Sequence, residues 1–300
     1  MGDYIAVVGG MNVDIGGRPA RRPVLRDSNP GRVSIRPGGV GRNIAHDLRL
    51  LGMEVRMLSA VGDDGHGALL LRSCAACGID TSVCLCVEGE TSSTYLYITD
   101  EHGDMQLAVA DMDVTARLTP AVIAARLDAL NAARAVVLDA NLEAETLAYL
   151  AAHVSAPLDA DPVSTGKAGR MRSILPRLAC IKPNALEAEA LTGESDPEKA
   201  ARALVNAGVG RVFLSLGHQG MIAADSDSLL NLPCEQARVL NTTGAGDAVT
   251  AALVWAGVRG LDLERSLRFA LRAGAVTCEC LEANNPALAE LPERFLEMKQ

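Results

Sequence analysis

The fold of this chain is decided by the stretch Asn241-Thr-Thr-Gly-Ala-Gly-Asp-Ala-Val-Thr250. It is a glycine-rich turn that follows an apolar segment ending at 239–240, which we expect to be a strand, and it opens a helical pattern over 248–256. The start of a helix leaves backbone N–H groups without intrahelical partners, and the helix dipole adds partial positive charge there. Gly244 and Gly246 let this backbone approach an anion closely, so the stretch is a candidate anion-binding site.

Asp247 lies at the mouth of this candidate anion site. It could accept the proton of a substrate hydroxyl while the amides of Ala245, Gly246 and Asp247 stabilise charge on a transferring phosphoryl group. The alternative is that Asp247 only complements the dipole of a helix, which is the commoner role of an isolated acid near a helix N-terminus. The choice between the two depends on features far upstream in the chain.

Length and composition narrow the class of protein. Three hundred residues suit one large domain or one domain with an appendage, and a hydrophobic fraction of 49% is ample for a buried core. The net charge is −9 and aromatic residues make up 3%, so we expect neither a general nucleic-acid binder nor a stacking platform for single strands. No apolar run reaches the ~18 residues of a membrane span, and the N-terminus lacks the basic start of a signal peptide.

The eight cysteines sit mostly in apolar surroundings. Cys74-Ala-Ala-Cys77 has the spacing of zinc and redox motifs, but no second Cys/His pair stands at ligand spacing and the motif falls inside a helical pattern. We therefore expect buried, reduced thiols and a cytoplasmic protein.

The chain begins with a strand that is followed by polar residues. Tyr4–Gly10 is a short apolar run closed by glycines, which is typical of a buried parallel strand. Asn12 and Asp14 follow it, at the carboxyl end where open α/β sheets bind ligands. These two residues either hydrogen-bond sugar hydroxyls or form a polar turn, and both interpretations stay open at this point.

A second glycine-rich turn is Pro37-Gly-Gly-Val-Gly-Arg-Asn43, which leads into a helix with Ile44, Leu48 and Leu51 on one face. A Gly-Gly-x-Gly run alone is a weak signal, because helix starts often use glycine. It carries weight only together with the turn at 241–250.

Two regions have the texture of a small β-sheet. Residues 15–36 are rich in Arg, Pro and Gly, which is typical of a turn, and end in a strand pattern at 32–36. Residues 92–99 and 105–110 are β-prone and are joined by the hairpin-type turn 100–104. Together they predict a sheet that stands apart from the α/β core.

The rest of the chain alternates between strand and helix patterns, which argues for a parallel sheet with helices on both faces. The expected helices are residues 69–77, 121–131, 143–153, 167–178, 185–192, 197–207, 245–257, 262–275 and a terminal helix within 286–300. The expected strands are residues 55–61, 135–138, 157–159, 180–182, 212–216, 221–224 and 228–232.

Two of these strands are followed by candidate binding residues. Asn184-Ala-Leu-Glu187 comes after the strand at 180–182, and Ser215-Leu-Gly-His-Gln-Gly220 is a glycine-bearing connection that could lie under a nucleotide. Each also has a plain structural interpretation, a helix N-cap for the first and a β-turn for the second, and each taken singly favours that interpretation.

Taken together, these features resemble the PfkB (ribokinase-like) family of sugar and nucleoside kinases over essentially the whole chain. The resemblance is carried by Gly38-Gly-Val-Gly-Arg-Asn-Ile-Ala45 and Asn241-Thr-Thr-Gly-Ala-Gly-Asp-Ala248, whose order, separation and settings make the pair highly specific. It implies ATP-dependent phosphorylation of a primary hydroxyl by an α/β, ribokinase-like fold, with a central, mostly parallel sheet flanked by helices and a small β-sheet lid. The core would comprise residues 1–14, 37–84 and 113–300, and the lid residues 15–36 and 85–112.

The resemblance also implies roles for individual residues. Asp247 would be the base, and Gly244, Ala245 and Gly246 the anion hole. Asn184 and Glu187 match the family's Asn-x-x-Glu and would organise Mg²⁺, mostly through water. The sugar would be held by Asn12, Asp14, Gly39, Asn43 and Glu143, and ATP would contact Asn184, Ser215, Gly217, Gly220, Thr243 and Asn285.

One position departs from the family pattern. Many members carry Asp where this chain has Asn241, and that acid helps to hold an activating monovalent cation. Asn can still offer a carbonyl oxygen, so a K⁺ site is expected to be weakened or lost. The cofactors that the resemblance implies with no such departure are ATP and Mg²⁺.

Within the family, four stretches look most like the bacterial pseudouridine kinases: Asp27–Gly31, Pro37–Ala45, Asp161–Thr165 and Asn284–Pro286. This resemblance implies phosphorylation of the 5′-hydroxyl of pseudouridine. Short amides and hydroxyls can pair with the two ring N–H donors and two carbonyls of this base. Asp27–Gly31 could instead merely turn the chain between lid strands. The candidate base-reading residues of the lid are Ser28, Asn29, Thr94 and Asp111.

Two alternatives are another sugar or nucleoside kinase, of the ribokinase or uridine type, and a non-catalytic nucleoside sensor on the same fold. Against the sensor, the base, the anion hole and Asn-x-x-Glu are all intact, and no helix-turn-helix pattern is appended. The expected partners are a small-molecule nucleoside and ATP, with no nucleic acid and no membrane. The family suggests a homodimer formed through the lid.

Overall fold

The computed structural model describes residues 2–297. Its core is an eight-stranded sheet in the order β14-β13-β12-β11-β10-β9-β1-β4. The strands from β4 to β12 along this order are parallel, and β13 and β14 extend one edge as antiparallel strands. The bounds are β1 (Ile5–Val8), β4 (Val55–Leu58), β9 (Ala135–Asp139), β10 (Leu158–Asp161), β11 (Leu178–Ile181), β12 (Arg211–Ser215), β13 (Met221–Ala224) and β14 (Leu229–Leu232).

Helices cover both faces of this sheet, because its buried strands are apolar on both sides. In β1, Ile5 and Val7 belong to one buried cluster while Ala6 and Val8 belong to the other. The first cluster is completed by α1 (Val40–Leu50), α2 (Gly65–Ala76), α9 (Ala245–Val258), α10 (Leu263–Cys278) and α11 (Leu291–Glu297). The second is completed by α3 (Pro120–Ala124), α4 (Leu127–Asn131), α5 (Ala144–His153), α6 (Thr165–Ala168), α7 (Ala185–Thr192) and α8 (Pro197–Asn206). The predicted α/β core is therefore confirmed.

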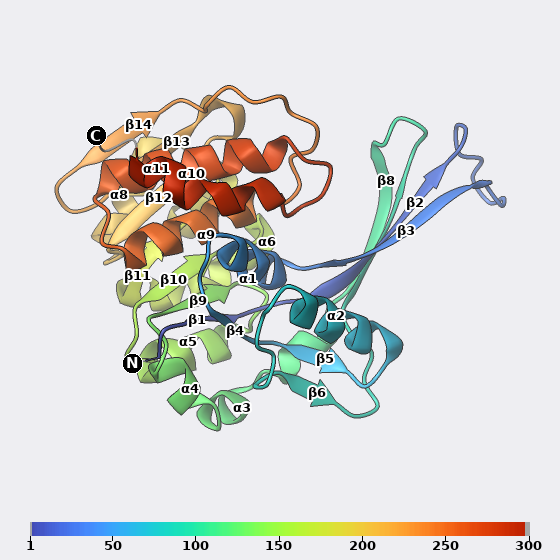
Figure 1. The fold of residues 1–300 in the computed structure, drawn as a ribbon, viewed down its shortest axis with the longest axis horizontal. Helices are drawn as coiled ribbons and strands as arrows, with labels where there is room; N and C mark the ends of the chain where they lie inside the picture. The colour runs from blue at the N-terminus through green and yellow to red at the C-terminus, as the bar shows by residue number, and fades with distance from the viewer. Residues whose placement is uncertain (1, 298–300) are drawn as a thin grey trace.

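A separate four-stranded sheet, which we call the lid sheet, projects from the core (Figure 1). Its order is β3-β2-β7-β8, with β2 parallel to β7 and the other pairs antiparallel. The predicted hairpin turn is present, since the N–H of Asp100 donates to the carbonyl of Asp104 at 2.9 Å. The bounds are β2 (Asn12–Pro19), β3 (Gly31–Gly38), β7 (Thr94–Thr99) and β8 (Met105–Asp111).

The lid sheet differs from the sequence prediction at its edges. The interpretation of residues 15–31 as a turn is wrong for 15–19, because β2 continues to Pro19 and pairs with β3 along its whole length. The predicted strand at 55–61 is interrupted at Ser59: β4 joins the large sheet, while β5 (Ala60–Gly62) pairs with β6 (Leu85–Val87) in a third sheet. Local apolarity cannot distinguish one strand from two that join different sheets.

Three other predicted elements are wrong in kind. The strand expected to end at 239–240 is absent: Val239 and Leu240 are 61% and 47% exposed, and the N–H of Leu240 donates to the carbonyl of Cys278 at the end of α10. Most of the helix expected at 167–178 is a 3-10 helix, Gly169–Arg177, which contains Pro176. The helix expected at 121–131 is divided into α3 and α4. The part of the predicted terminal helix at 298–300 lies outside the described residues.

All eight cysteines are free thiols. Cys74 is buried in α2, as predicted, but the expectation of buried thiols is wrong for Cys86 and Cys234, which are exposed. Within residues 2–297 no cluster of three or more His, Cys, Asp or Glu side chains is arranged to hold a metal ion. Across the same residues, no helix combines the length and apolarity needed to cross a bilayer.

Candidate active site

The carboxyl ends of the parallel strands gather polar side chains at one edge of the sheet, where open α/β folds bind ligands. Asn12 follows β1, Asp161 ends β10, Lys182 follows β11 and Ser215 ends β12. The glycine-rich start of α9 reaches this edge, because Lys182 Nζ lies 3.2 Å from where a Cβ on Gly246 would stand. Residues far apart in sequence thus form one candidate site.

The turn before α9 requires glycine at one position. Gly244 is the N-cap of α9 with φ of 84°, and a Cβ there would stand 2.1 Å from the carbonyl oxygen of Ala283. The N–H of Ala245 donates to Thr242 at 3.3 Å. The amides of Gly246 and Asp247, which no described residue pairs, are therefore the ones that remain for an anion at this helix start.

The candidate base Asp247 is linked to the second glycine-rich motif. The side-chain amide of Asn43, in the first turn of α1, donates to Asp247 Oδ2 at 2.9 Å across 204 residues of sequence. Burial, followed by the nearby carboxylate of Asp161, raises the pKa of Asp247 to about 7, against the stabilising effects of Asn43 and Lys182. A carboxyl with this pKa can take a proton from a hydroxyl near neutral pH.

Asp161 and Lys182 form a buried ion pair at 3.1 Å beside Asp247. Burial opposes the charge on Lys182, but the carboxylates of Asp161, Glu187 and Asp247 outweigh it and raise the pKa of the lysine. Thr250 Oγ1 donates to Asp161 Oδ2 at 2.8 Å. The pair is neutral as a whole, but it holds the Lys182 ammonium at the start of α9, where it can donate hydrogen bonds to a phosphoryl group.

Sequence reasoning missed both members of this pair as site residues. Lys182 was available as the polar end of an apolar run, two residues before Asn184, and Asp161 as the acid that ends the neighbouring strand in the sheet. No local pattern joins them, because the contact exists only when β10 and β11 lie side by side.

Asn184 and Glu187 form a capping box at the start of α7. Glu187 N donates to Asn184 Oδ1 and Asn184 N donates to Glu187 Oε2, each at 2.9 Å. One oxygen of each side chain is therefore committed to the helix, and the Glu187 carboxylate lies close enough to Lys182 to raise the pKa of that lysine. Mg²⁺ commonly binds through one or two carboxylates, water and substrate phosphates, so these residues fit the predicted water-mediated role.

The predicted sugar-binding residues come from β2 and α1. Asn12 Nδ2 donates to Asp14 Oδ1 at 2.6 Å, and burial raises the pKa of Asp14. Gly39, with φ of 98°, lets the start of α1 approach Met11, since a Cβ would stand 2.6 Å from its Cα. A pocket of about 340 Å³ opens here, and its lining includes Asp14, Arg36, Arg42, Asn43, His46, Tyr97, Asn241, Thr243 and Asn284. Arg42 and His46 were not among the predicted site residues.

Glu143 is the predicted sugar ligand that the structure brings least clearly to the site. Its carboxylate pairs with Arg170 at 3.1 Å, and its side chain is half exposed. Asn141 lies closer to the β1 edge, 2.7 Å from where a Cβ on Gly10 would stand, and accepts a hydrogen bond from Lys167 Nζ at 2.6 Å.

The predicted nucleotide residues divide into two groups. Ser215 bridges to Asn184 where β11 and β12 end, and Gly217 has φ of 61° beside open space. Gly220 is required for another reason, because a Cβ there would stand 2.0 Å from the carbonyl of Leu232. Asn285 is committed structurally: its side chain donates to Val276 O at 2.6 Å and accepts from Ala287 N at 3.0 Å.

The predicted base-reading residues are not brought together with Asp247. Ser28 and Asn29 lie in the exposed β2–β3 connection, at the far tip of the lid sheet (Figure 1), where Asn29 bonds the backbone of Val24. Thr94 and Asp111 face each other across β7 and β8, nearer the core, and Thr94 also contacts His66 at 3.1 Å. Their role in base recognition stays a prediction.

The residues present do not fit a monovalent cation held by Asn241. The side-chain nitrogen of Asn241 donates to the carbonyl of Leu281 at 3.0 Å, and its oxygen accepts from Thr243 N at 3.0 Å. Both ends of the amide are therefore bonded to the backbone, and the nitrogen offers no lone pair to a cation.

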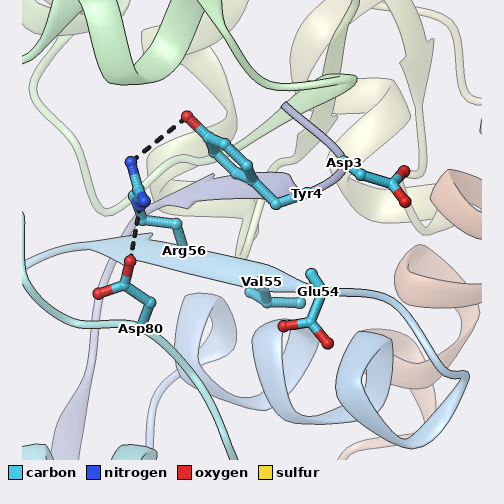
Figure 2. Close-up of a pocket in the computed structure, with 6 residues that line it drawn as sticks. All are labelled: Asp3, Tyr4, Glu54, Val55, Arg56 and Asp80. Carbon is cyan, nitrogen blue, oxygen red and sulfur yellow. Dashed lines mark hydrogen bonds and ion pairs between the residues drawn. The ribbon is translucent and has the colours of Figure 1, made fainter. Parts of the chain in front are cut away.

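A second pocket, of about 250 Å³, lies at the opposite edge of the sheet, where β1 and β4 begin (Figure 2). Arg56 joins Asp80 at 2.7 Å and Tyr4 at 3.4 Å. The carboxylates of Asp3 and Glu54 also line it, as Figure 2 shows. This pocket lies at the amino ends of the strands, whereas open α/β folds bind ligands at the carboxyl ends, so the site at the carboxyl edge is the candidate active site.

Comparisons with known proteins agree with this geometry. The pseudouridine kinase of Escherichia coli (strain K12) is 37% identical over 297 residues, covering 96% of this chain and 94% of that protein. An uncharacterized sugar kinase of the same organism is 35% identical over 298 residues, covering 96% and 81%. The solved ribokinase of Arabidopsis thaliana complexed with ribose and ATP has a TM-score of 0.87 at 23% identity, over 98% and 99% of the two chains, which concerns the fold alone.

The model of the pfkB family of carbohydrate kinases matches residues 3–290, and the chain belongs to that family.

Proposed function

We propose that this protein transfers the γ-phosphoryl group of ATP to a primary hydroxyl, with Asp247 as the general base. The observation that carries the proposal is the position of Asp247: it lies in the first turn of α9, beside unpaired backbone amides, and accepts a hydrogen bond from Asn43 of the sugar side. The base takes the hydroxyl proton, while the amides of Gly246 and Asp247 stabilise the charge that develops on the phosphoryl group.

ATP would lie along the carboxyl edge of the sheet, near Ser215 and Gly217, with its phosphates toward Lys182 and the start of α9. Bound Mg²⁺ would neutralise phosphate charge, and Asn184 and Glu187 are the residues that would orient it through water. The position of Lys182 supports this arrangement, because its ammonium group, held by Asp161, lies beside Gly246, where the phosphates would meet the helix.

We propose pseudouridine as the substrate and its 5′-hydroxyl as the acceptor. Support comes from the 37% identity to the E. coli pseudouridine kinase and from the four resembling stretches in the sequence. Another sugar or nucleoside is the alternative, since relatives of similar identity include a sugar kinase of unassigned substrate.

We also propose a homodimer through the lid sheet. Cross-strand registers place Ile15, Ile35, Leu96 and Val109 in one row, so these side chains share a face of the sheet. Several aliphatic side chains of this face are exposed, Leu107 at 64% among them. A second copy of the same face would remove this surface from water. The free thiols support a reducing compartment, the cytoplasm.

The first test is ADP release from MgATP with a panel of acceptors: pseudouridine, uridine, cytidine, adenosine, ribose and fructose 6-phosphate. Strong preference for pseudouridine over uridine supports the full proposal. Turnover of ribose or uridine instead keeps the kinase and refutes the substrate. Binding of nucleosides without turnover of any acceptor favours a sensor.

The second test is Asp247→Asn, which removes the base and leaves the fold of α9. We expect kcat to fall ~10²-fold or more while nucleoside binding changes little. Near-normal turnover of this variant would remove Asp247 from the mechanism.

A further inference from the structure

Behind the candidate base lies a buried chain of hydrogen bonds that joins α1 to the segment after α10. Arg42 Nη1 donates to Asn284 Oδ1 at 2.8 Å and to Asn43 Oδ1 at 3.2 Å. Asn284 Nδ2 donates in turn to the carbonyl of Asn43 at 3.1 Å and to Asp47 Oδ1 at 2.8 Å. All four side chains are at most 8% exposed. The chain ends at Asp247, which accepts from Asn43.

The donor and acceptor chemistry of this network admits one orientation of Asn43. A guanidinium group carries only donors, so the side-chain oxygen of Asn43 must face Arg42. Its NH₂ group must then face Asp247, and that group can bond only to a lone pair of the carboxylate. Without Arg42, the amide of Asn43 could rotate and present its oxygen to Asp247, which would disfavour the ionised base.

Asn284 is held just as strictly, because its oxygen accepts from Arg42 and its nitrogen serves two acceptors. Arg42 is a buried cation whose direct partners are neutral amides, and its Nε has no partner among the described residues. A buried charge of this kind opposes stability unless it is well paired. Arg42 is also the donor to two buried amide oxygens, and its charge lowers the pKa of Asp14 and Asp47, so it acts on the polar groups of the site and not on packing alone.

We propose that Arg42 is a positioning residue for the base: it fixes the amide of Asn43 so that Asn43 donates to Asp247, and Asn284 holds Arg42 in place. The inference rests on the proposed function, because it assumes that Asp247 is the base. The positioning role extends the proposed function, because it connects the loop at 279–285, on the nucleotide side, with the sugar side of the site.

Other charged groups also face Asp247, and they set the background for a pH measurement. They are Asp161 at the end of β10, Asp139 at the end of β9, Lys182 after β11 and Asp47 on α1. An Arg42 variant leaves these four side chains in place and removes a positive charge that lowers the pKa of Asp47. Loss of the fixed donor from Asn43 therefore raises the pKa of Asp247, and the acid limb of the kcat/KM profile moves to higher pH.

The experiment compares Arg42→Met, Arg42→Lys and Asn284→Ala with the wild type in the steady-state kinase assay from pH 5 to 9. The acceptor is whichever one the panel identifies. For Arg42→Met we expect kcat to fall ~10-fold and the acid limb to rise by about half a pH unit, with little change in KM for ATP. Lys keeps a donor, so Arg42→Lys restores part of the shift. Asn284→Ala moves the limb in the same direction by less.

The matched control is Arg49→Met, which removes an arginine from the same helix. Arg49 donates to Met53 O at 2.9 Å and pairs with Glu54 at 2.6 Å, away from the site. The acid limb of the kcat/KM profile of Arg49→Met should therefore stay where it is in the wild type. Loss of activity in Arg42→Met with an unmoved limb, or a raised KM for the acceptor with unchanged kcat, would overturn the proposal. If Arg42→Met does not fold, as judged by its melting temperature, the pH profiles of Asn284→Ala and Arg42→Lys decide.

Asp247→Asn distinguishes failure of the proposed function from failure of the positioning role. An active Asp247→Asn variant refutes Asp247 as the base. An inactive Asp247→Asn variant, together with an Arg42→Met pH profile like that of the wild type, refutes only the positioning role.

Discussion

At the scale of single residues, the proposed chemistry depends on the pKa of one carboxyl group, which the surrounding side chains set. Asp247 is surrounded by groups of both signs. Burial and Asp161 raise its pKa, while Asn43 and Lys182 lower it, and the result is about 7. A base is useful only when ionised, so activity should be lost as pH falls through about 7.

Asp161→Asn tests this account of the base. Removing a neighbouring negative charge favours the ionised form of Asp247, which lowers its pKa, so the acid limb of kcat/KM should move to lower pH. The control is Asp159→Asn, two residues earlier at the amino end of β10, beside Arg211. A pH–rate series on both variants would contradict the account if the two limbs moved together or neither moved.

Asn241 is the second residue whose chemistry is decided locally. Its amide nitrogen bonds the Leu281 carbonyl that an oxygen-bound cation would use. We expect the same initial rate in K⁺, Na⁺ and tetramethylammonium buffers. In Asn241→Asp a carboxylate oxygen would face the Leu281 oxygen with no proton between them, so activity should fall and K⁺ should restore it. Several-fold stimulation of the wild type by K⁺ would contradict this.

At the scale of elements, α9 is held in place because all its residues from Ala248 to Ala256 are buried. Trp255, the chain's one tryptophan, is fully buried and stacks on Phe269 of α10 with ring centroids 4.4 Å apart. These contacts hold the helix whose first turn carries Asp247. Asp247 and Trp255 are more than about ten Å apart along α9, since a helix extends about 1.5 Å per residue. The precision of the site therefore depends on packing at that distance.

Trp255→Ala should lower the free energy of unfolding by ~3–5 kcal/mol, because it leaves a cavity in a close-packed cluster. Leu296→Ala on α11, where the side chain is 40% exposed, is the control and should cost less than ~1 kcal/mol. Urea unfolding followed by circular dichroism measures both, since the tryptophan signal is lost in the first variant. Equal effects would mean that α9 is not anchored by this residue.

At the scale of the whole molecule, the two faces of the lid sheet differ in chemistry. Asp14, Arg36 and Tyr97 lie on the face that lines the pocket at the site. Val33 and Leu107 lie on the other face, which is aliphatic and exposed at 73% and 64%. The lid sheet projects from the core (Figure 1), and on this face Ile15 packs against the core while Val33 and Leu107 remain exposed.

Leu107→Glu should convert the expected homodimer into a monomer, because a charge placed in an apolar interface loses its hydration. Sedimentation or light scattering at several concentrations measures the mass. Leu296→Glu adds the same charge to an exposed position outside the lid sheet and should leave the dimer intact. A wild-type chain that is monomeric at every concentration would refute the proposal.

The sequence by itself determined the fold class and the two ends of the site. Apolar runs alternating with helical patterns specify a parallel sheet, and the turns at 37–43 and 241–250 are local signals because glycine, helix start and acid are neighbours in the chain. Such local signals can be recognised in the sequence without knowledge of any long-range contact. That is why Asp247, Asn43 and the capping pair Asn184 and Glu187 could all be predicted.

Only the tertiary structure decided which side chains meet. The Asp161–Lys182 pair depends on β10 lying beside β11, and the Arg42–Asn284 contact joins residues 242 positions apart. Tertiary contacts also overruled local patterns: Val239-Leu240 is apolar yet exposed, and its backbone bonds the end of α10 instead of a strand. The carbonyl of Leu232 leaves no room for a side chain at Gly220, which no local pattern could show. Burial, charge pairing and close approach belong to the folded arrangement, so no stretch of the chain contains them alone.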